Sequence, residues 1–148
     1  MNASGGERLL LSPVFGRDRD GKEAATFPPT KVSAHERRAL LRVVDDYLTY
    51  CFALETPPRV DELALLLGMS APRLSYLFKA LVGERPSLYL KCLQIEHAKE
   101  LLLSTNLQMN AVGYASCFGT RTTFFRAFRK YTRTTPEQYR ATYSKVQF

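Results

Sequence analysis

The part of this sequence most suited to chemistry is the stretch GTRTTFFRAFRK, Gly119 to Lys130, which holds four cationic side chains and no acidic one. A typical surface helix mixes both signs, because Glu–Lys pairs one turn apart stabilise it. Cationic groups along a whole helix suit a polyanion, and a guanidinium can donate two hydrogen bonds to the O6 and N7 atoms of one guanine. The stretch therefore predicts a helix that binds nucleic acid. A solvated basic helix packed by two Phe side chains fits the same residues and stays open as the alternative.

Local signals place these side chains on a helix. Thr120 can cap its N-terminus, since a Thr hydroxyl accepts hydrogen bonds from the amides of the first turn. Phe124, Ala127 and Phe128 follow at the spacing of a buried stripe. The other faces carry the candidate contacts, which are Arg121, Thr122, Arg126, Arg129 and Lys130. The first three lie early, where a helix in the major groove meets base edges, and the last two lie later, where phosphate is the expected contact.

The distribution of charge supports an acidic partner. The net charge is +7, and the segment from Gly119 onward holds seven Lys or Arg and one Asp or Glu, whereas residues 1–56 hold eight of each sign. Charge gathered in one region indicates an acidic partner better than a uniformly high pI does. Nucleic acid and an anionic membrane surface both fit. Of these two we expect nucleic acid and no membrane partner, and no apolar run approaches the roughly eighteen residues of a membrane-spanning helix.

Residues suited to catalysis or metal binding are scattered. Cys51, Cys92 and Cys117 are odd in number and far apart, which fits neither a disulfide framework nor a zinc site, and we expect buried, reduced thiols. His35 and His97 are distant from each other and provide no nucleophile–base pair. The sequence therefore predicts no catalytic residue, no metal site and no cofactor, which argues against an enzyme.

The 148 residues can form one domain, or two small ones plus a tail. Residues 1–32 are predicted to be a mobile arm, because Gly5-Gly6, Pro28-Pro29 and the charged run between them leave no apolar period. The folded part begins at Ser33, which forms the pattern of a capping box with Glu36. A helix is expected from there to about Leu54, with the apolar stripe Leu40, Val43, Val44, Tyr47, Leu48 and Cys51.

A helix, a tight turn and a second helix follow within about two dozen residues. Asp61 to Leu67 is predicted to be a short helix that ends at Gly68. Ser70 then caps a second helix, Ala71 to Leu81, which ends at Gly83. Its expected buried stripe is Leu74, Leu77 and Phe78. The arrangement is typical of a helix-turn-helix motif, although any small helical hairpin can show the same pattern.

Pro86 begins a longer predicted helix that ends near Leu103. Its expected core residues are Tyr89, Leu93, Ala98, Leu101 and Leu102. We expect His97 to be exposed beside Glu96 and Glu100.

The helix-turn-helix pattern then repeats. Fifty residues after Leu74, Phe78, Pro86 and Tyr89 come Phe124, Phe128, Pro136 and Tyr139. Before the turn the better offset is forty-nine, which pairs Leu63 with Val112 and Met69 with Phe118. The second turn is therefore predicted to have one extra residue. An internal repeat of a two-helix unit is hard to obtain by chance.

Two segments carry a family resemblance: VDELALLLGMSAPRLSYLFKALVGERPSLYLKCLQIEHAKELLLSTN and FGTRTTFFRAFRKYTRTTPEQYR. Over roughly Ser33 to Thr142 they resemble the AraC/XylS-type DNA-binding domain, most specifically at Phe124 to Phe128 and Pro136 to Arg140. The resemblance implies an all-α fold of about seven helices over residues 33–148. Two helix-turn-helix subdomains, about 33–84 and about 106–143, would be joined by a linker helix at about 86–103. It also implies a transcription regulator, expected to be an activator, whose partners are double-stranded DNA and RNA polymerase.

The resemblance assigns DNA contacts by position. The first recognition helix would offer Pro72, Arg73, Ser75, Tyr76 and Lys79. The second would offer the set already chosen from residue types, Arg121, Thr122, Arg126, Arg129 and Lys130. We expect the second helix to dominate electrostatic affinity, and the first to add shape and thymine-methyl contacts. Packing on the helix surface is the alternative for Tyr76, and a core or interface position is the alternative for Phe125.

Five positions depart from the family pattern. Cys117 and Arg133 stand where Gly is usual, and Gly113 stands where a small helix-former is expected. Arg85 replaces the Ser or Thr cap before Pro86, and Gln94 replaces an Arg. Because Gly inside a helix costs about 1 kcal/mol relative to Ala, the second unit is expected to be less rigid than in typical members.

The family resemblance does not extend to a ligand-binding domain. An arm of 32 residues cannot enclose a pocket of the usual ~300–1,000 Å³. The chain is therefore similar to the short MarA-like activators or is a fragment of a longer protein, and we expect a monomer or weak dimer acting on the nucleoid in the cytoplasm. The remaining alternative is a protein-interaction module that keeps the fold and sequesters another regulator.

Overall fold

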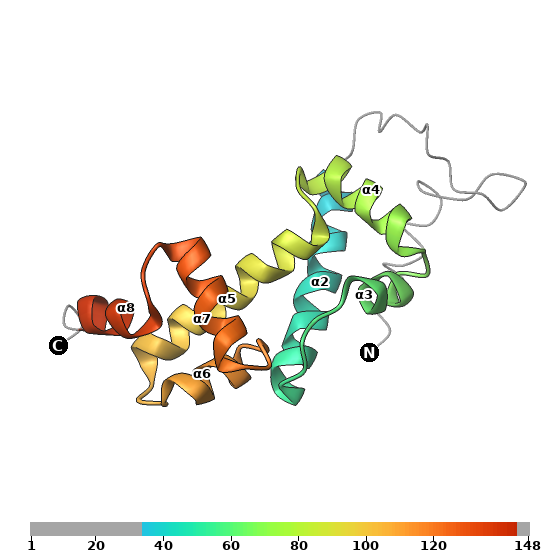
Figure 1. The fold of residues 1–148 in the computed structure, drawn as a ribbon. Helices are drawn as coiled ribbons and strands as arrows, with labels where there is room; N and C mark the ends of the chain where they lie inside the picture. Colours follow the sequence, from blue (N-terminus) through green and yellow to red (C-terminus); the bar gives the residue numbers. More distant parts are fainter. Residues whose placement is uncertain (1–33, 145–148) are drawn as a thin grey trace, which may run out of the picture. The chain divides into compact units, whose positions relative to one another are not determined.

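The structure, a computed structural model, describes residues 34–144, and within this range it contains seven α-helices and no strand (Figure 1). They are α2 (Ala34–Leu54), α3 (Val60–Leu66), α4 (Ala71–Val82), α5 (Pro86–Ser104), α6 (Met109–Ala115), α7 (Arg121–Thr132) and α8 (Pro136–Tyr143). The expected all-α fold of about seven helices is confirmed. The predicted arm, residues 1–32, and the Ser33 half of the capping box lie outside the described residues.

The described chain forms two compact units. The first contains residues 34–47 and 59–88, and the second contains residues 48–58 and 89–144. The division differs from the expected subdomain boundaries, because the last turns of α2 and most of α5 belong to the second unit. Contacts inside that unit explain the difference: the Cys117 thiol donates to the Cys51 carbonyl oxygen at 3.2 Å, and the Phe52 ring stacks on His97 with 4.0 Å between centroids.

In the first unit, Tyr47 of α2 fixes the start of α3. Its hydroxyl accepts a hydrogen bond from the Arg59 backbone N–H at 2.8 Å and donates to Glu62 Oε1 at 2.7 Å. Of the apolar stripe predicted for α2, Val43 is half-buried and the other five residues are buried. The helix is thereby held by its apolar face and by one polar contact to the next helix.

The helix signals predicted for α3 and α4 are present. Gly68 and Gly83 adopt φ of +72° and +95°, the left-handed conformation that ends a helix at little cost in Gly. Ser70 Oγ accepts a hydrogen bond from the Arg73 backbone N–H, which caps α4. The predicted stripe Leu74, Leu77 and Phe78 is completely buried.

The core of the second unit is built from α5, α6, the turn after α6, and α7 (Figure 1). Its buried side chains are Ile95, Ala98, Leu102, Val112, Phe118, Phe124 and Phe128. The centroid of the Phe124 ring lies 5.4 Å from that of Phe118 and 5.7 Å from that of Phe128. The Tyr139 ring of α8 continues the row, with its centroid 5.5 Å from that of Phe128. Aromatic pairs at such separations add about 0.5–1.5 kcal/mol each beyond the burial of area. The stripe predicted for α7 is thus part of the core.

Helix α5 is buried on other sides than expected. Of the five predicted core residues, Ala98 and Leu102 are buried, whereas Tyr89, Leu93 and Leu101 are half-buried. Leu90, Gln94 and Ile95 are buried instead. A single amphipathic stripe was the wrong premise, because the part of α5 in the second unit is contacted both by the end of α2 and by the helices that follow it.

Candidate nucleic-acid interface

Helix α7 is positioned by a cap at its start and by two buried rings. Thr120 Oγ1 accepts a hydrogen bond from the Thr123 backbone N–H at 3.1 Å, as its type and place predicted. Phe124 and Phe128 have no exposed surface. Their burial fixes the rotation of α7 about its own axis, and this rotation decides which side chains face outward.

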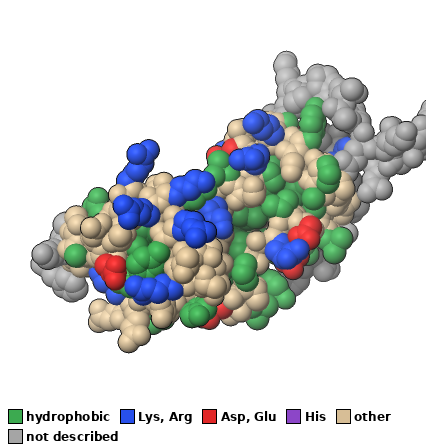
Figure 2. Space-filling view, viewed as in Figure 1, with side chains coloured by type: hydrophobic (Ala, Val, Ile, Leu, Met, Phe, Trp, Pro, Cys, Tyr) green, Lys and Arg blue, Asp and Glu red, His purple; other side chains and the backbone are tan. Residues whose placement is uncertain are grey.

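The outward face of α7 is made of cations and a hydroxyl. At about 100° per residue, Arg126 projects roughly 160° away from both buried rings. Thr122, Arg129 and Lys130 lie within roughly 60° of Arg126, and all four side chains are exposed. No hydrogen bond or ion pair joins the side chain of Arg126 to another residue of the range 34–144. Figure 2 shows Lys and Arg side chains gathered on the visible face of the second unit.

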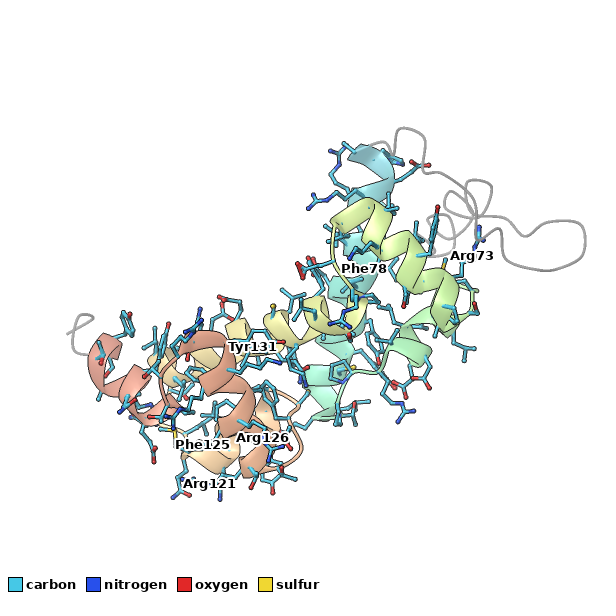
Figure 3. The ribbon with its side chains drawn as sticks, turned by 45° about the horizontal axis from the view of Figure 1, so that its top comes forward. Arg73, Phe78, Arg121, Phe125, Arg126 and Tyr131 are labelled. Carbon is cyan, nitrogen blue, oxygen red and sulfur yellow. The ribbon has the colours of Figure 1, made fainter. Side chains whose placement is uncertain are left out.

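Arg121 is oriented differently, although the sequence grouped it with Arg126. It lies about 140° around the helix from Arg126, and its Nη1 donates to Asn110 Oδ1 of α6 at 3.2 Å. Its Nη2 is 3.7 Å from Glu137 Oε2 of α8, and its guanidinium lies 4.2 Å from the centre of the Phe125 ring (Figure 3). Arg121 therefore contacts three neighbours in its own unit while 52% of its side chain stays exposed.

The turn before α7 repeats the turn before α4 with one more residue, as predicted. Residues 67–70 join α3 to α4, and residues 116–120 join α6 to α7. Both turns close with the same hydrogen bond, from Met69 N to the Ala64 carbonyl oxygen and from Phe118 N to the Gly113 carbonyl oxygen. Cys117 has φ of +67° where Gly68 has +72°, so this cysteine adopts the conformation that the usual Gly would take.

Gln94 holds this second turn, a role that the sequence did not reveal. The side chain is 3% exposed, and its Nε2 donates to the carbonyl oxygens of Ser116 at 3.1 Å and Cys117 at 2.9 Å. Burial, the neighbouring Cys51 and the charge of Glu55 raise the pKa of the Cys117 thiol to about 12, which keeps it protonated and able to donate. The expected buried thiols are found at Cys51 and Cys117, and Cys92 is half-buried.

Gly113 has a packing role that the sequence did not reveal. A Cβ atom at this position would lie 3.1–3.2 Å from side-chain atoms of Phe124. Such a contact is too close for carbon atoms at their preferred separation of about 3.5–4.0 Å. Gly113 therefore permits α6 to approach the Phe124 ring, and its cost in helix propensity is offset by this packing.

The end of α7 is set by Arg133, which adopts φ of +65° at the C-cap. Helix α8 then begins with a complete capping box, in which Thr135 Oγ1 accepts from the Gln138 backbone N–H and Gln138 Oε1 accepts from the Thr135 backbone N–H. Glu137 lies in this first turn, so the capping box also fixes the backbone that carries the carboxylate beside Arg121.

The outward face of α4 has the same geometry and a weaker charge. Pro72, Tyr76 and Lys79 are exposed, and each occurs fifty residues before Thr122, Arg126 and Arg129. Ser75 is half-buried, at the position equivalent to Phe125. Only Lys79 brings a positive charge to this face.

Of the five residues predicted to contact DNA on α4, only Arg73 is buried. Its exposed fraction is 6%. Its position on α4 is about 40° around the helix from Leu77, and Leu77 belongs to the buried stripe. Arg73 also lies about 60° from the exposed Tyr76, and the equivalent residue of α7, Thr123, is exposed, so the helical position alone does not account for the burial of Arg73.

The range that the structure describes contains no candidate metal site. No group of three His, Cys, Asp or Glu side chains in that range is placed to hold a metal ion. His97 is half-buried against Phe52 rather than exposed, and this burial lowers its pKa. Among the same residues no single helix is long and apolar enough to cross a membrane, and α3 and α4 reach that composition only as a pair bent by 87°.

Known proteins resemble this chain in sequence and in fold. Residues 63–142 match a family described as a helix-turn-helix domain. The xylose operon regulatory protein of Escherichia coli K12 is 32% identical over 88 residues, which are 60% of this chain and 22% of that protein. The DNA-binding domain of AdpA, a global transcriptional factor solved with a target DNA, is 25% identical with a TM-score of 0.66, over 73% of this chain and 95% of that chain. A transcriptional regulator with an AraC-type DNA-binding domain, from Chromobacterium violaceum, is 28% identical with a TM-score of 0.63, over 74% and 95% of the two chains.

The matched residues contain the elements that give the candidate interface its geometry, from the buried Leu63 of α3 to the end of α8. The relatives are named as transcription or operon regulators, two of them by their DNA-binding domains, and the chain spans less than a quarter of the length of the xylose regulator. The fold, the repeated turn and the matches agree. The chain belongs to the AraC/XylS-type family of helix-turn-helix DNA-binding domains of transcription regulators.

Proposed function

We propose that this chain binds double-stranded DNA at specific sequences through α7 and α4 and thereby activates transcription. The observation that carries the proposal is the outward face of α7. Three cations and a hydroxyl are exposed there, opposite two fully buried rings, on a helix that holds no acidic residue. A rigid cationic helix face of this kind suits the major groove, which admits an α-helix and offers a distinct pattern of donors and acceptors for each base pair.

Within this face the roles divide by position. Arg126 projects furthest from the core and is proposed to donate two hydrogen bonds to one guanine, which is worth about 1–3 kcal/mol of discrimination. Thr122, one turn earlier, is proposed to contact a neighbouring base edge. Arg129 and Lys130 are proposed to bind phosphate, which fixes the register of the helix without selecting a sequence.

Helix α4 is proposed to add contacts of a different kind. Tyr76 and Ser75 offer hydroxyls, and Tyr76 together with Pro72 offers an apolar surface to thymine methyl groups. Lys79 is proposed to bind phosphate. Arg73 is left out of the proposed contacts because its side chain is buried.

Two unequal recognition helices in one chain imply an asymmetric DNA site. We propose that the two helices enter successive major grooves, so that two different half-sites lie about one helical turn, roughly 34 Å, apart. A monomer or weak dimer can then bind without the palindrome that a symmetric dimer requires. Contact with RNA polymerase belongs to the same proposal and is supported by the resemblance to activators of the family.

The proposal is tested by selecting DNA from a random pool and measuring affinity for the selected and for random DNA at several salt concentrations. Arg126→Ala should remove the preference at one base position, whereas Lys130→Ala should weaken binding to every sequence and reduce the slope of log K against log salt by about 0.9. Lys99→Ala serves as the control, because Lys99 lies on α5 and pairs with Glu96. Equal losses on all sequences for Arg126→Ala and Lys130→Ala would contradict the assigned roles.

The alternative, an interaction module that sequesters another regulator, is an outcome of the same experiment. It predicts weak binding to all DNA with no sequence preference. Transcription in vitro from a promoter that carries the selected site then tests activation, which should require both the site and Arg126.

A further inference from the structure

Glu137 is the single acidic residue in the segment from Gly119 to the last residue, where seven cations occur. It occupies the first turn of α8, beside the capping box of Thr135 and Gln138. Its Oε2 atom lies 3.7 Å from Arg121 Nη2, and Arg121 is the first residue of α7. The only carboxylate of a strongly cationic segment is therefore paired with the arginine that begins the recognition helix.

The guanidinium of Arg121 is engaged at both ends and on one face. Nη1 donates to Asn110 Oδ1, Nη2 faces Glu137, and the Phe125 ring lies against the plane at 4.2 Å from its centre (Figure 3). A DNA phosphate would be a second anion for the same guanidinium. Glu137 and phosphate therefore compete for the charge of Arg121.

The geometry points to Glu137 as a residue that raises the sequence selectivity of the second unit by competing with DNA phosphate for Arg121. The inference rests on the proposed function, since it concerns the same DNA interface. Arg121 lies about 140° around α7 from Arg126, away from the outward face, but it is the first residue of the helix and 52% of its side chain is exposed, so a released guanidinium is free to turn toward the DNA backbone. A phosphate contact strengthens binding to all sequences alike. Holding Arg121 on the protein therefore lowers affinity for random DNA and leaves selection to Arg126.

The size of the effect on DNA affinity follows from the solvent exposure of the Arg121 and Glu137 side chains. Both partners are more than half exposed, with 52% and 57% of their side chains accessible. Exposed ion pairs of this kind contribute little, and their loss changes an equilibrium by about two- to fivefold. Removing Glu137 should therefore raise affinity for random DNA by about two- to fivefold at low salt, and one additional phosphate contact should steepen the salt slope by about 0.9.

The test compares the full chain with Glu137→Gln, which keeps the shape of the side chain and removes its charge. Binding is measured by fluorescence anisotropy on selected and random DNA over a series of salt concentrations. Glu100→Gln is the matched control, since Glu100 is an equally charged, exposed residue of the same unit on α5. Each change is also made in an Arg121→Met background, and thermal unfolding of every variant shows that the fold is kept.

We expect Glu137→Gln to bind random DNA more tightly, with a steeper salt slope and a smaller ratio of selected to random affinity, and to lose this effect in the Arg121→Met background. An unchanged slope, the same gain without Arg121, or the same gain from Glu100→Gln would overturn the inference. So would a loss of affinity confined to the selected DNA, because Glu137 would then be orienting Arg121 toward a base. If the unaltered chain shows no sequence preference, the proposed function itself fails, and this result is distinguishable from all the others.

Discussion

Replacing Arg133 by Gly should stabilise the second unit. Arg133 ends α7 with φ of +65°, and its backbone N–H donates to the Arg129 carbonyl oxygen at 2.9 Å. The left-handed conformation costs an L-residue about 1–2 kcal/mol, whereas Gly adopts it freely. The equivalent residue of the first unit, fifty positions earlier, is Gly83 with φ of +95°. Two helices of this chain thus end in the left-handed conformation, one at Gly83 without strain and the other at Arg133 with it.

The expected change in the free energy of unfolding is the difference between two contributions. Relief of the backbone strain contributes about 1–2 kcal/mol, and the greater freedom of Gly in the unfolded chain removes about 0.5–1 kcal/mol. Arg133 is exposed, so little packing is lost with its side chain. The net gain should be about 0.5–1 kcal/mol, or about 2–6 °C in Tm for a domain of this size.

Thermal and urea unfolding provide the assay, followed by far-UV circular dichroism and by tyrosine fluorescence, since the chain has no Trp. Agreement of the two signals tests whether the units unfold together. Cys117→Gly is the control: it relieves the same conformation, at φ of +67°, but removes a buried thiol and its hydrogen bond to the Cys51 carbonyl oxygen, so it should bring no gain. A Tm at or below that of the unaltered chain for Arg133→Gly would refute the reasoning.

Three further changes test contacts around the second turn and the end of α2. Gly113→Ala should lower the free energy of unfolding, measured by urea unfolding. The added Cβ atom would lie 3.1–3.2 Å from the Phe124 side chain, and this overpacking should cost about 1–3 kcal/mol. That cost exceeds the ~1 kcal/mol gained in helix propensity. Gln94→Met should cost about 1–3 kcal/mol in the same assay, since two buried carbonyl oxygens lose their donor, and Gln94→Arg should restore much of the loss because a guanidinium donates to both. Burial lowers the pKa of His97, so the folded chain binds its proton less readily than the unfolded chain. The corresponding stability should be complete above the ordinary pKa of about 6.5 and should decline as the pH falls below it, whereas His97→Phe, which keeps an aromatic ring against Phe52, should lose this part of the pH dependence.

The features that the sequence predicted are those encoded by neighbouring residues. Thr120 and Ser70 as caps, and Gly68 and Gly83 as stops, act through hydrogen bonds and torsion angles within one turn, so the residue type at one position is sufficient. The repeat at an offset of fifty residues also needs no coordinates. The orientation of α7 followed from these signals together with its two Phe residues.

The features that the sequence missed depend on contacts between distant residues. Gln94 reaches carbonyl groups 22 and 23 residues later, and nothing beside it in the sequence indicates that partner. Gly113 resembles a helix defect until Phe124, eleven residues later, is seen to pack on it. Arg73 was assigned as a DNA contact by its position in the family pattern, and nothing beside it in the sequence indicates that its side chain is buried. Glu137 had no recognisable role until α8 was placed beside the start of α7.

The internal repeat explains why the two recognition helices share a geometry and differ in chemistry. Leu74 and Phe78 of α4 are buried, as are the equivalent Phe124 and Phe128 of α7, so the outward positions are equivalent as well, and Tyr76 and Arg126 each lie roughly 160° from both buried residues of their helix. A change of residue at these positions alters what is contacted in DNA without altering how the helix is held. The triple Thr122, Arg126 and Arg129 of α7 has two cations where Pro72, Tyr76 and Lys79 of α4 have one. The expectation that the second helix dominates electrostatic affinity therefore follows from side-chain identity at matched positions and requires no difference between the two helix-turn-helix frameworks.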